Sequence, residues 1–214
     1  MFISDVITKF EEYVDDATEL SSTQELDLCQ KIYNKVWNNR PWVFAQTPAT
    51  GNTSTSVPYI ALPEDFSYVI SNNQETGSSA PYTNDIAPKV IFLVKSSNNY
   101  SPVQLINWND RRKYVDQDGY AYINLVNSQI VFTKQPDTVY PYEFDYVKTP
   151  DTLTTNSTPA FPTQFHDMLY HGMAVDDDII LRFPKAQSYA PDNQAKYDSY
   201  LTDMAWWNSQ FYMN

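Results

Sequence analysis

The sequence is poor in the residues on which most catalytic and metal sites depend. Its 214 residues include one cysteine, two histidines and four glycines. A single cysteine excludes a disulfide within the chain and a thiol-rich metal site. So few glycines argue against a glycine-rich loop that would hold phosphate groups. We therefore expect no disulfide framework, no nucleotide site and a reducing, cytosolic place of synthesis.

Basic residues are also scarce. Lys and Arg number 14 against 26 Asp and Glu, so the formal net charge is −12. Wrapping nucleic acid through its phosphates requires clustered Lys and Arg, which argues against a DNA-binding protein. An acidic surface repels DNA and suits a passage through which DNA slides. Plain solubility explains the same charge equally well, and both interpretations stay open.

Long hydrophobic runs are missing as well. No stretch approaches the roughly 18 apolar residues that a membrane-spanning helix needs. The first five residues, Met-Phe-Ile-Ser-Asp, lack the basic region and the small-residue cleavage site of a signal peptide. We expect no membrane segment.

Apolar residues at helical spacing occupy both ends of the chain. Residues 3–14 and 22–37 carry such stripes, and Ser22 and Glu25 have the spacing of a capping box. Further stripes predict a helix over residues 162–183 and another after Pro191. Pro184 is expected to end the first of these two.

The middle of the chain has the alternation and turn residues of strands. Residues 90–94 and 103–106 predict buried strands, 119–132 a hairpin, and 140–146 a half-buried strand near a sheet edge. Polar stretches at 47–56 and 71–88 predict loops. The expected fold is α+β, a helical bundle with an inserted antiparallel β-sheet or sandwich. Its parts would be residues 1–56, 57–148 and 149–214.

No group of residues indicates a reaction. His166 and His171 are five apart, which puts them on different faces of a helix, and no G-x-S-x-G motif accompanies them. Cys29 falls on an apolar stripe and is expected to be a small core residue. The sequence predicts no enzyme, no metal and no cofactor.

Two charged clusters are candidates for contacts with other molecules. Arg111, Arg112 and Lys113 form the one basic cluster, which could meet DNA or an acidic partner, or offset nearby aspartates. Asp176 falls on an apolar helix stripe, unlike Asp177 and Asp178, which we expect in solvent. It could pair with Lys31, Lys35 or Arg182 of its own chain, or with a neighbouring subunit.

The aromatic residues near the end of the chain are the clearest indication of a contact surface. Trp206, Trp207, Phe211 and Tyr212 lie within seven residues. Terminal residues usually fray unless they dock, and Trp and Tyr are frequent anchors of interfaces. Docking on another chain and closing of the chain's own helical core are both open interpretations.

The pattern of spaced aromatics and prolines resembles the head–tail adaptor (connector or neck) proteins of tailed bacteriophages, including the tubular tail proteins beside the portal. It includes Asn-Arg-Pro-Trp-Val-Phe at 39–44, Leu-Pro-Glu-Asp-Phe at 62–66, Tyr-Glu-Phe-Asp-Tyr at 142–146 and Phe-Pro at 161–162. The resemblance implies a ring below the portal, typically dodecameric, through which double-stranded DNA passes without specific binding. It also implies that the next tail component docks on the far side and that the C-terminal segment reaches the portal. The protein would then be a virion component made in the host cytoplasm.

Two other classes remain as alternatives. A β-rich module that binds carbohydrate or another surface ligand would account for Tyr and Asn in loops. A hydrolase would need a residue such as His166 to be essential for a measurable activity.

Overall fold

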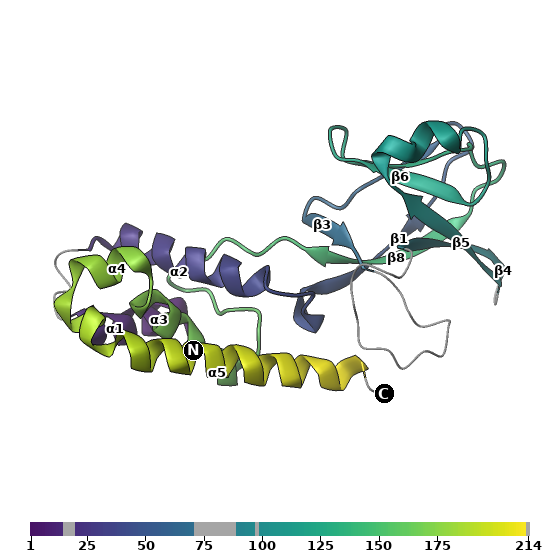
Figure 1. The fold of residues 1–214 in the computed structure, drawn as a ribbon. Coiled ribbons are helices and arrows are strands. Elements are labelled where there is room, and N and C mark those ends of the chain that lie inside the picture. Colours follow the sequence, from purple (N-terminus) through teal and green to yellow (C-terminus); the bar gives the residue numbers. More distant parts are fainter. Residues whose placement is uncertain (15–19, 71–88, 97–98, 213–214) are drawn as a thin grey trace. The chain divides into compact units, whose positions relative to one another are not determined.

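The computed structural model describes residues 1–14, 20–70, 89–96 and 99–212 (Figure 1). The chain forms two compact units, which we call the helical unit (Met1–Ala45 with Pro150–Asn214) and the sheet unit (Gln46–Thr149). The α+β class, with helices near both chain ends and a sheet between them, is as predicted. The sheet unit begins at Gln46, whereas the sequence placed that boundary at residue 57. The loop expected at 71–88 lies outside the described residues.

The first two helices have the predicted bounds. α1 (Ile3–Val14) buries Ile3, Val6, Ile7, Phe10 and Val14 along one face. α2 (Ser22–Trp37) has a capping box, but its members are Ser21 and Gln24, one position before the expected pair. Ser21 Oγ accepts the Gln24 N–H, and Gln24 Oε1 accepts the Ser21 N–H. The shift leaves Glu25 outside the cap and buried.

The segment that contains Leu153, Thr155 and Ser157 has no regular secondary structure and forms hydrogen bonds with both α1 and α2. Gln30 Oε1 on α2 accepts the Leu153 N–H at 2.6 Å. The carbonyls of Thr155 and Ser157 accept the first backbone N–H groups of α1. Because helix N-termini carry unpaired N–H groups, this segment satisfies donors that would otherwise need water. It leads to the short 3₁₀ helix η3 (Thr163–Phe165) and to α3 (Asp167–Ala174).

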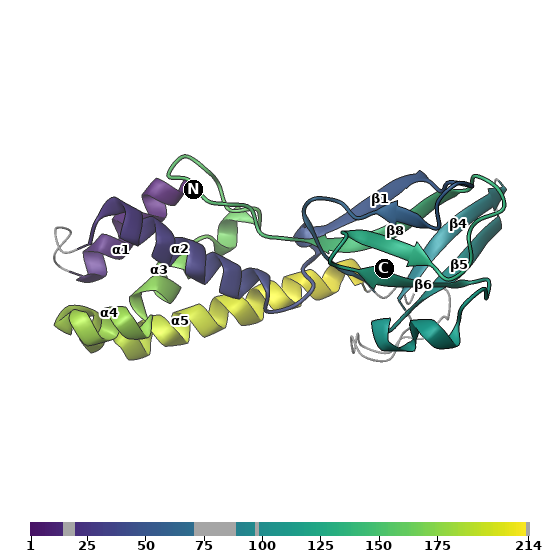
Figure 2. The same cartoon turned by 90° about the horizontal axis from the view of Figure 1, so that it is seen from above.

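α3 is the central helix of the helical unit and packs against α1, α2 and α5 (Figure 2). Six of its eight residues are buried. A Cβ added at Gly172 would lie 2.6 Å from Ile32 Cγ2 of α2 and 2.8 Å from Tyr197 Cε2 of α5. Only glycine therefore fits where α3 meets these two helices.

The prediction of a single helix over 162–183 is wrong, because the helical structure is interrupted at Asp176. The Asp176 side chain accepts the Asp178 N–H and caps α4 (Asp177–Arg182). Capping of this kind favours an aspartate at a helix start over its interior. The stripe therefore spans two helices and not one.

α5 (Pro184–Ser209) begins earlier than predicted and contains Pro191 within its 26 residues. An internal proline removes one helical hydrogen bond and costs about 3 kcal/mol. Pro191 and Gln187, whose carbonyl loses its partner, are both exposed, so water can bind that carbonyl. Burial of Ala186, Tyr197 and Met204 stabilises the helix on both sides of the proline.

The strands of the described residues form one eight-stranded sheet in the order β1-β8-β4-β5-β6-β7-β2, with β3 also paired to β8. Their bounds are β1 Gln46–Asn52, β2 Tyr59–Ala61, β3 Phe66–Val69, β4 Val90–Ser96, β5 Asn99–Ile106, β6 Tyr120–Asn124, β7 Gln129–Phe132 and β8 Pro141–Lys148. The expectation of purely antiparallel pairing is wrong, because β5 and β6 are parallel. Parallel neighbours need a crossover connection, and residues 107–119 supply it.

β8 is the strand around which the sheet unit is built. β1 pairs with one edge of β8, and β3 and β4 share the other edge. Pro141 is therefore not on a sheet edge; it is the first residue of β8, where a missing N–H is tolerated. Tyr142, Phe144 and Tyr146 follow the predicted alternation, and the last two are buried. β1 itself lies where the sequence predicted a loop at 47–56.

The hairpin of β6 and β7 is as predicted, although its turn is longer. Asn124 pairs with Gln129, so residues 125–128 form the connection. A two-residue type I′ turn would need positive φ at both central residues, and in this connection only Ser128 has it, at 50°. The longer turn leaves Leu125 70% and Val126 93% exposed.

Candidate interaction surfaces

The end of α5 and the 3₁₀ helix η4 (Gln210–Tyr212) that follows it carry exposed aromatic side chains. Trp206 is 68% exposed and Phe211 is 53% exposed. Trp207 lies between them in sequence and packs edge-on against Phe165 and Phe211, with centroid distances of 6.1 and 4.8 Å. The side chain of Tyr212 lies outside the described part. We call Trp206, Trp207 and Phe211 the C-terminal aromatic surface.

Contacts with other residues of the helical unit fix the position of this surface. The 3₁₀ helix η1 (Val43–Ala45) donates the Val43 N–H to Asn208 Oδ1 at 2.7 Å. Asn208 is buried, and Met204 one turn earlier is completely buried. These contacts fix the end of the helix although it is near the chain end, where fraying is common. Trp207 is half-buried and packs against Phe165 of its own helical unit, whereas Trp206 and Phe211 are exposed. Docking of the two exposed side chains on another chain stays a prediction.

A second surface lies on the crossover between β5 and β6, in the 3₁₀ helix η2 (Trp108–Lys113). In a 3₁₀ helix, residues i and i+3 lie above one another. The Arg111 guanidinium accordingly stacks on the Trp108 ring at 3.8 Å, and Lys113 pairs with Asp110 at 2.6 Å. Arg112 is exposed and has no hydrogen bond or ion pair with any described residue. We call Trp108, Arg111 and Arg112 the η2 platform.

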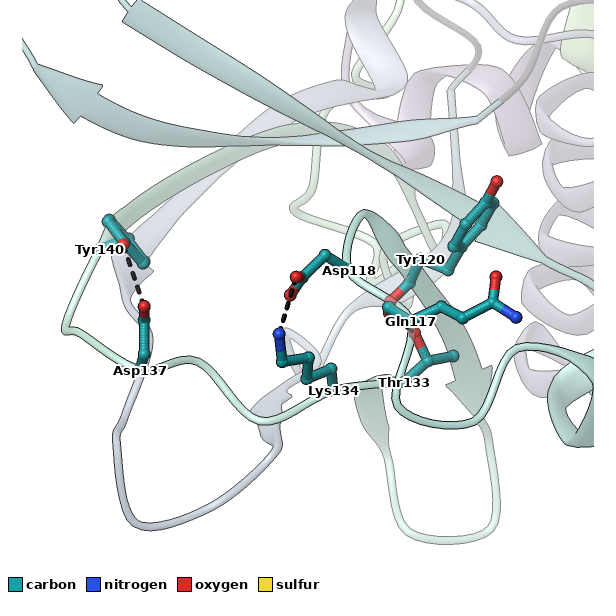
Figure 3. A network of polar contacts seen from close by, with 7 residues as sticks. All are labelled: Gln117, Asp118, Tyr120, Thr133, Lys134, Asp137 and Tyr140. Atoms are coloured by element: carbon teal, nitrogen blue, oxygen red, sulfur yellow. Dashed lines mark hydrogen bonds and ion pairs between the residues drawn. The ribbon is translucent and has the colours of Figure 1, made fainter.

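Polar contacts fix the loops near η2 (Figure 3). Thr133 donates its hydroxyl to the carbonyls of Gln117 and Tyr120, at 2.7 and 2.9 Å. Lys134 pairs with Asp118 at 2.7 Å, and Tyr140 donates to Asp137 at 3.1 Å. Lys113 and Lys134 thus each have a carboxylate of their own, whereas Arg111 and Arg112 have none among the described residues.

Both histidines are core residues. His166 lies between η3 and α3, and its Nε2 is 2.8 Å from the Phe161 carbonyl oxygen. Nδ1 of His171 is 2.8 Å from Asn193 Oδ1. Burial lowers the pKa of both imidazoles, so both are neutral near pH 7. Among the residues that the structure describes, no cluster of three His, Cys, Asp or Glu could hold a metal ion. Cys29 is buried, as predicted, and burial raises its pKa to about 12.

Asp176 has an ionic partner within its own chain. Its Oδ2 lies 2.7 Å from Lys31 Nζ on α2, and this hydrogen bond raises the pKa of Lys31. Of the pairings that the sequence allowed, the structure contains the one with Lys31. Because a carboxylate can accept more than one hydrogen bond, pairing of Asp176 with a neighbouring subunit stays a prediction.

Glu25 is a site that the sequence did not reveal. Its side chain is 3% exposed, and Oε1 has no hydrogen-bond partner among the described residues. Burial, and then the neighbouring Glu11 carboxylate of α1, raise the pKa of Glu25 to about 6 from 4.5. The sequence analysis placed Glu25 in a capping box with Ser22, because the sequence could not show which of two adjacent serines caps the helix.

We expect Glu25→Gln to stabilise the protein above pH 7. As pH rises from about 4.5 to 6, the unfolded chain releases the Glu25 proton first, so the wild type loses stability over that window. The variant lacks this loss and should gain about 1–2 kcal/mol at pH 7.5. Urea unfolding at pH 4 and pH 7.5 measures this gain. A gain of equal size at both pH values would contradict it.

Comparison with known protein families matches residues 1–212 to the model of the SU10 adaptor protein. The match defines the class of the protein as a structural adaptor from the head–tail junction of bacteriophages. The chain belongs to the SU10 adaptor protein family. No curated protein matches it.

The family gives the exposed surfaces a context. Its members are virion components with a structural role, which implies contacts with portal and tail proteins and with further copies of the chain. Within the described residues, no helix has the length and apolar character to cross a membrane.

Proposed function

We propose that this protein forms a dodecameric ring below the portal, extends the DNA channel and presents a docking platform for the next tail or neck protein. The helical unit, as the bundle of this fold, would bind the portal through the C-terminal aromatic surface. The observation that carries the proposal is the exposure of Trp206 and Phe211 at a helix end fixed by Asn208 and Met204. Fixed aromatic side chains bind with a small loss of conformational entropy.

The charge of the chain supports the passage of DNA. Each copy carries a formal charge of −12, so a ring of copies would surround the channel with negative potential. DNA phosphates would be repelled and would find few cations to bind during ejection. The ring would thereby line the channel without binding the DNA that passes through it.

Mass measurement of the purified protein with and without portal protein tests this function. We expect complexes with portal to gain a multiple of the 24.8 kDa chain mass that equals the copy number of a ring. A protein that is monomeric alone and oligomeric on the portal fits the proposal. Absence of binding to portal, at concentrations where both proteins are folded, would refute it.

A further inference from the structure

We propose that the η2 platform binds a second copy of this chain, through the exposed Asp177, Asp178 and Leu181 of α4 on that copy. This contact would join neighbouring subunits of the ring and therefore rests on the function proposed above. It assigns a partner to Arg112, Asp177 and Asp178, which are exposed and form no ion pair with a described residue.

The cations of the platform remain available to a partner. Asp110 and Asp118, the carboxylates beside η2 that form ion pairs, are engaged by Lys113 and Lys134. Arg111 donates one N–H to the Trp108 carbonyl at 2.7 Å and stacks on the indole ring. Its remaining N–H groups and those of Arg112 can donate to carboxylate oxygens of a partner. Asp116 and Asp137 are further exposed carboxylates, near Lys134, without an ion pair among the described residues.

The platform suits a protein partner better than duplex DNA. DNA binding of useful strength requires many phosphate contacts, and two arginines beside several aspartates offer few. Trp and Arg, by contrast, are the residues that most often dominate protein interfaces. Trp108 is 42% exposed and is supported by Tyr122, whose ring lies edge-on at a centroid distance of 5.2 Å. A preformed indole and guanidinium pair offers both an apolar face and directed N–H donors.

Charge favours a second copy as the partner. Two chains of net charge −12 repel each other unless their contact places cations against carboxylates. On α4, Asp177 and Asp178 are exposed, while Asp176 is already engaged by Lys31. Leu181 on the same helix is 83% exposed. Two carboxylates and an apolar side chain on one short helix complement two guanidinium groups and an indole ring.

The two surfaces also meet the symmetry requirement of a ring. A cyclic assembly with more than two members needs a heterologous contact, in which two different faces of each subunit match. The η2 platform lies on the sheet unit and α4 on the helical unit, so they are different faces. Each subunit would offer its platform to one neighbour and α4 to the other.

Charge reversal tests the contact. We expect Arg112→Asp and Asp178→Arg, made separately, each to weaken oligomer formation on portal at least about tenfold, because each places like charges together. The two changes combined in one chain should restore assembly, since the ion pair is rebuilt with its charges exchanged. Lys196→Asp changes the net charge by the same amount as Arg112→Asp at an exposed position of α5 and is expected to assemble normally.

The outcome is read by mass measurement of portal complexes and by far-ultraviolet circular dichroism of each variant. Singles that assemble like the wild type, or a combined variant no better than the singles, would overturn the contact while leaving the ring intact. Failure of the wild-type chain to assemble on portal would instead refute the proposed function. The two failures are therefore distinguishable.

Discussion

A chain with alanine at both Trp206 and Phe211 is expected to fold normally and to bind portal protein at least about 30-fold more weakly than the wild type. Truncating an aromatic anchor at the centre of an interface commonly costs 2 kcal/mol or more, which is about 30-fold in affinity. Both side chains are more than half exposed, so little of the core is lost. Titration of portal with each protein measures the change.

The matched control is Phe2→Ala combined with Tyr189→Ala. These aromatic side chains belong to the same helical unit and are 54% and 47% exposed. The control removes similar apolar area from another part of the surface and should bind portal like the wild type. Equal weakening by both pairs would show that the C-terminal aromatic surface has no special role in binding.

Replacing Trp42 with alanine is expected to lower the free energy of unfolding by about 3–5 kcal/mol. Trp42 is completely buried, stacks on Phe44 with a centroid distance of 5.8 Å, and donates its indole N–H to the Val36 carbonyl at 2.7 Å. Its removal leaves a cavity at the end of α2 and takes a hydrogen bond from that carbonyl. Urea unfolding, followed by tryptophan fluorescence and circular dichroism, gives the loss.

Trp42→Phe separates the two contributions. Phenylalanine keeps an aromatic ring against Phe44 but has no N–H to donate to Val36. We expect a loss of about 1–2 kcal/mol for this variant, mainly from the missing hydrogen bond and the smaller ring. An alanine variant as stable as the phenylalanine variant would be incompatible with a tightly packed Trp42.

Helices with one regular apolar face were predictable from the sequence. Ile3, Val6, Ile7 and Phe10 recur at helical spacing, and burial of this face stabilises α1 as the pattern implies. The predictions that were wrong concern the helix ends, where neighbouring residues compete for the same role. Ser21 and Ser22 can both cap a helix, and only packing selects Ser21. At Pro191, packing of Tyr197 and Met204 outweighs the local cost of the proline.

For the sheet, the sequence predicted some strands but not how all of them pair. Alternation located β8, because a strand with one buried face has a period of two. Parallel pairing of β5 with β6 depends on the path of the crossover at 107–119, which no local pattern encodes. β1 was missed because the strand it pairs with, β8, lies nearly a hundred positions later, and its own polar residues are typical of a loop.

The sequence predicted the cluster of aromatic residues near the chain end, but not which of them are exposed, Trp206 and Phe211, and which is half-buried, Trp207. The stacking of Arg111 on Trp108 had a local signal, the i, i+3 spacing, which becomes informative only in a 3₁₀ helix. The burial of Glu25 had no such signal. It follows from how α1 meets α2, which depends on tertiary packing.

The interruption of the helical unit by the sheet unit also sets the order in which the chain can fold. α1 and α2 leave the ribosome first, but α3, which packs against both, follows only after residues 46–149. At typical synthesis rates that wait lasts roughly 5–20 s. Gln46 pairs with Val147, so the two ends of the sheet unit are brought together when its ladder of β1 and β8 forms. Folding of the sheet thus brings the second part of the helical unit close to the first. The apolar faces of α1 and α2 become buried only when α3 packs against them.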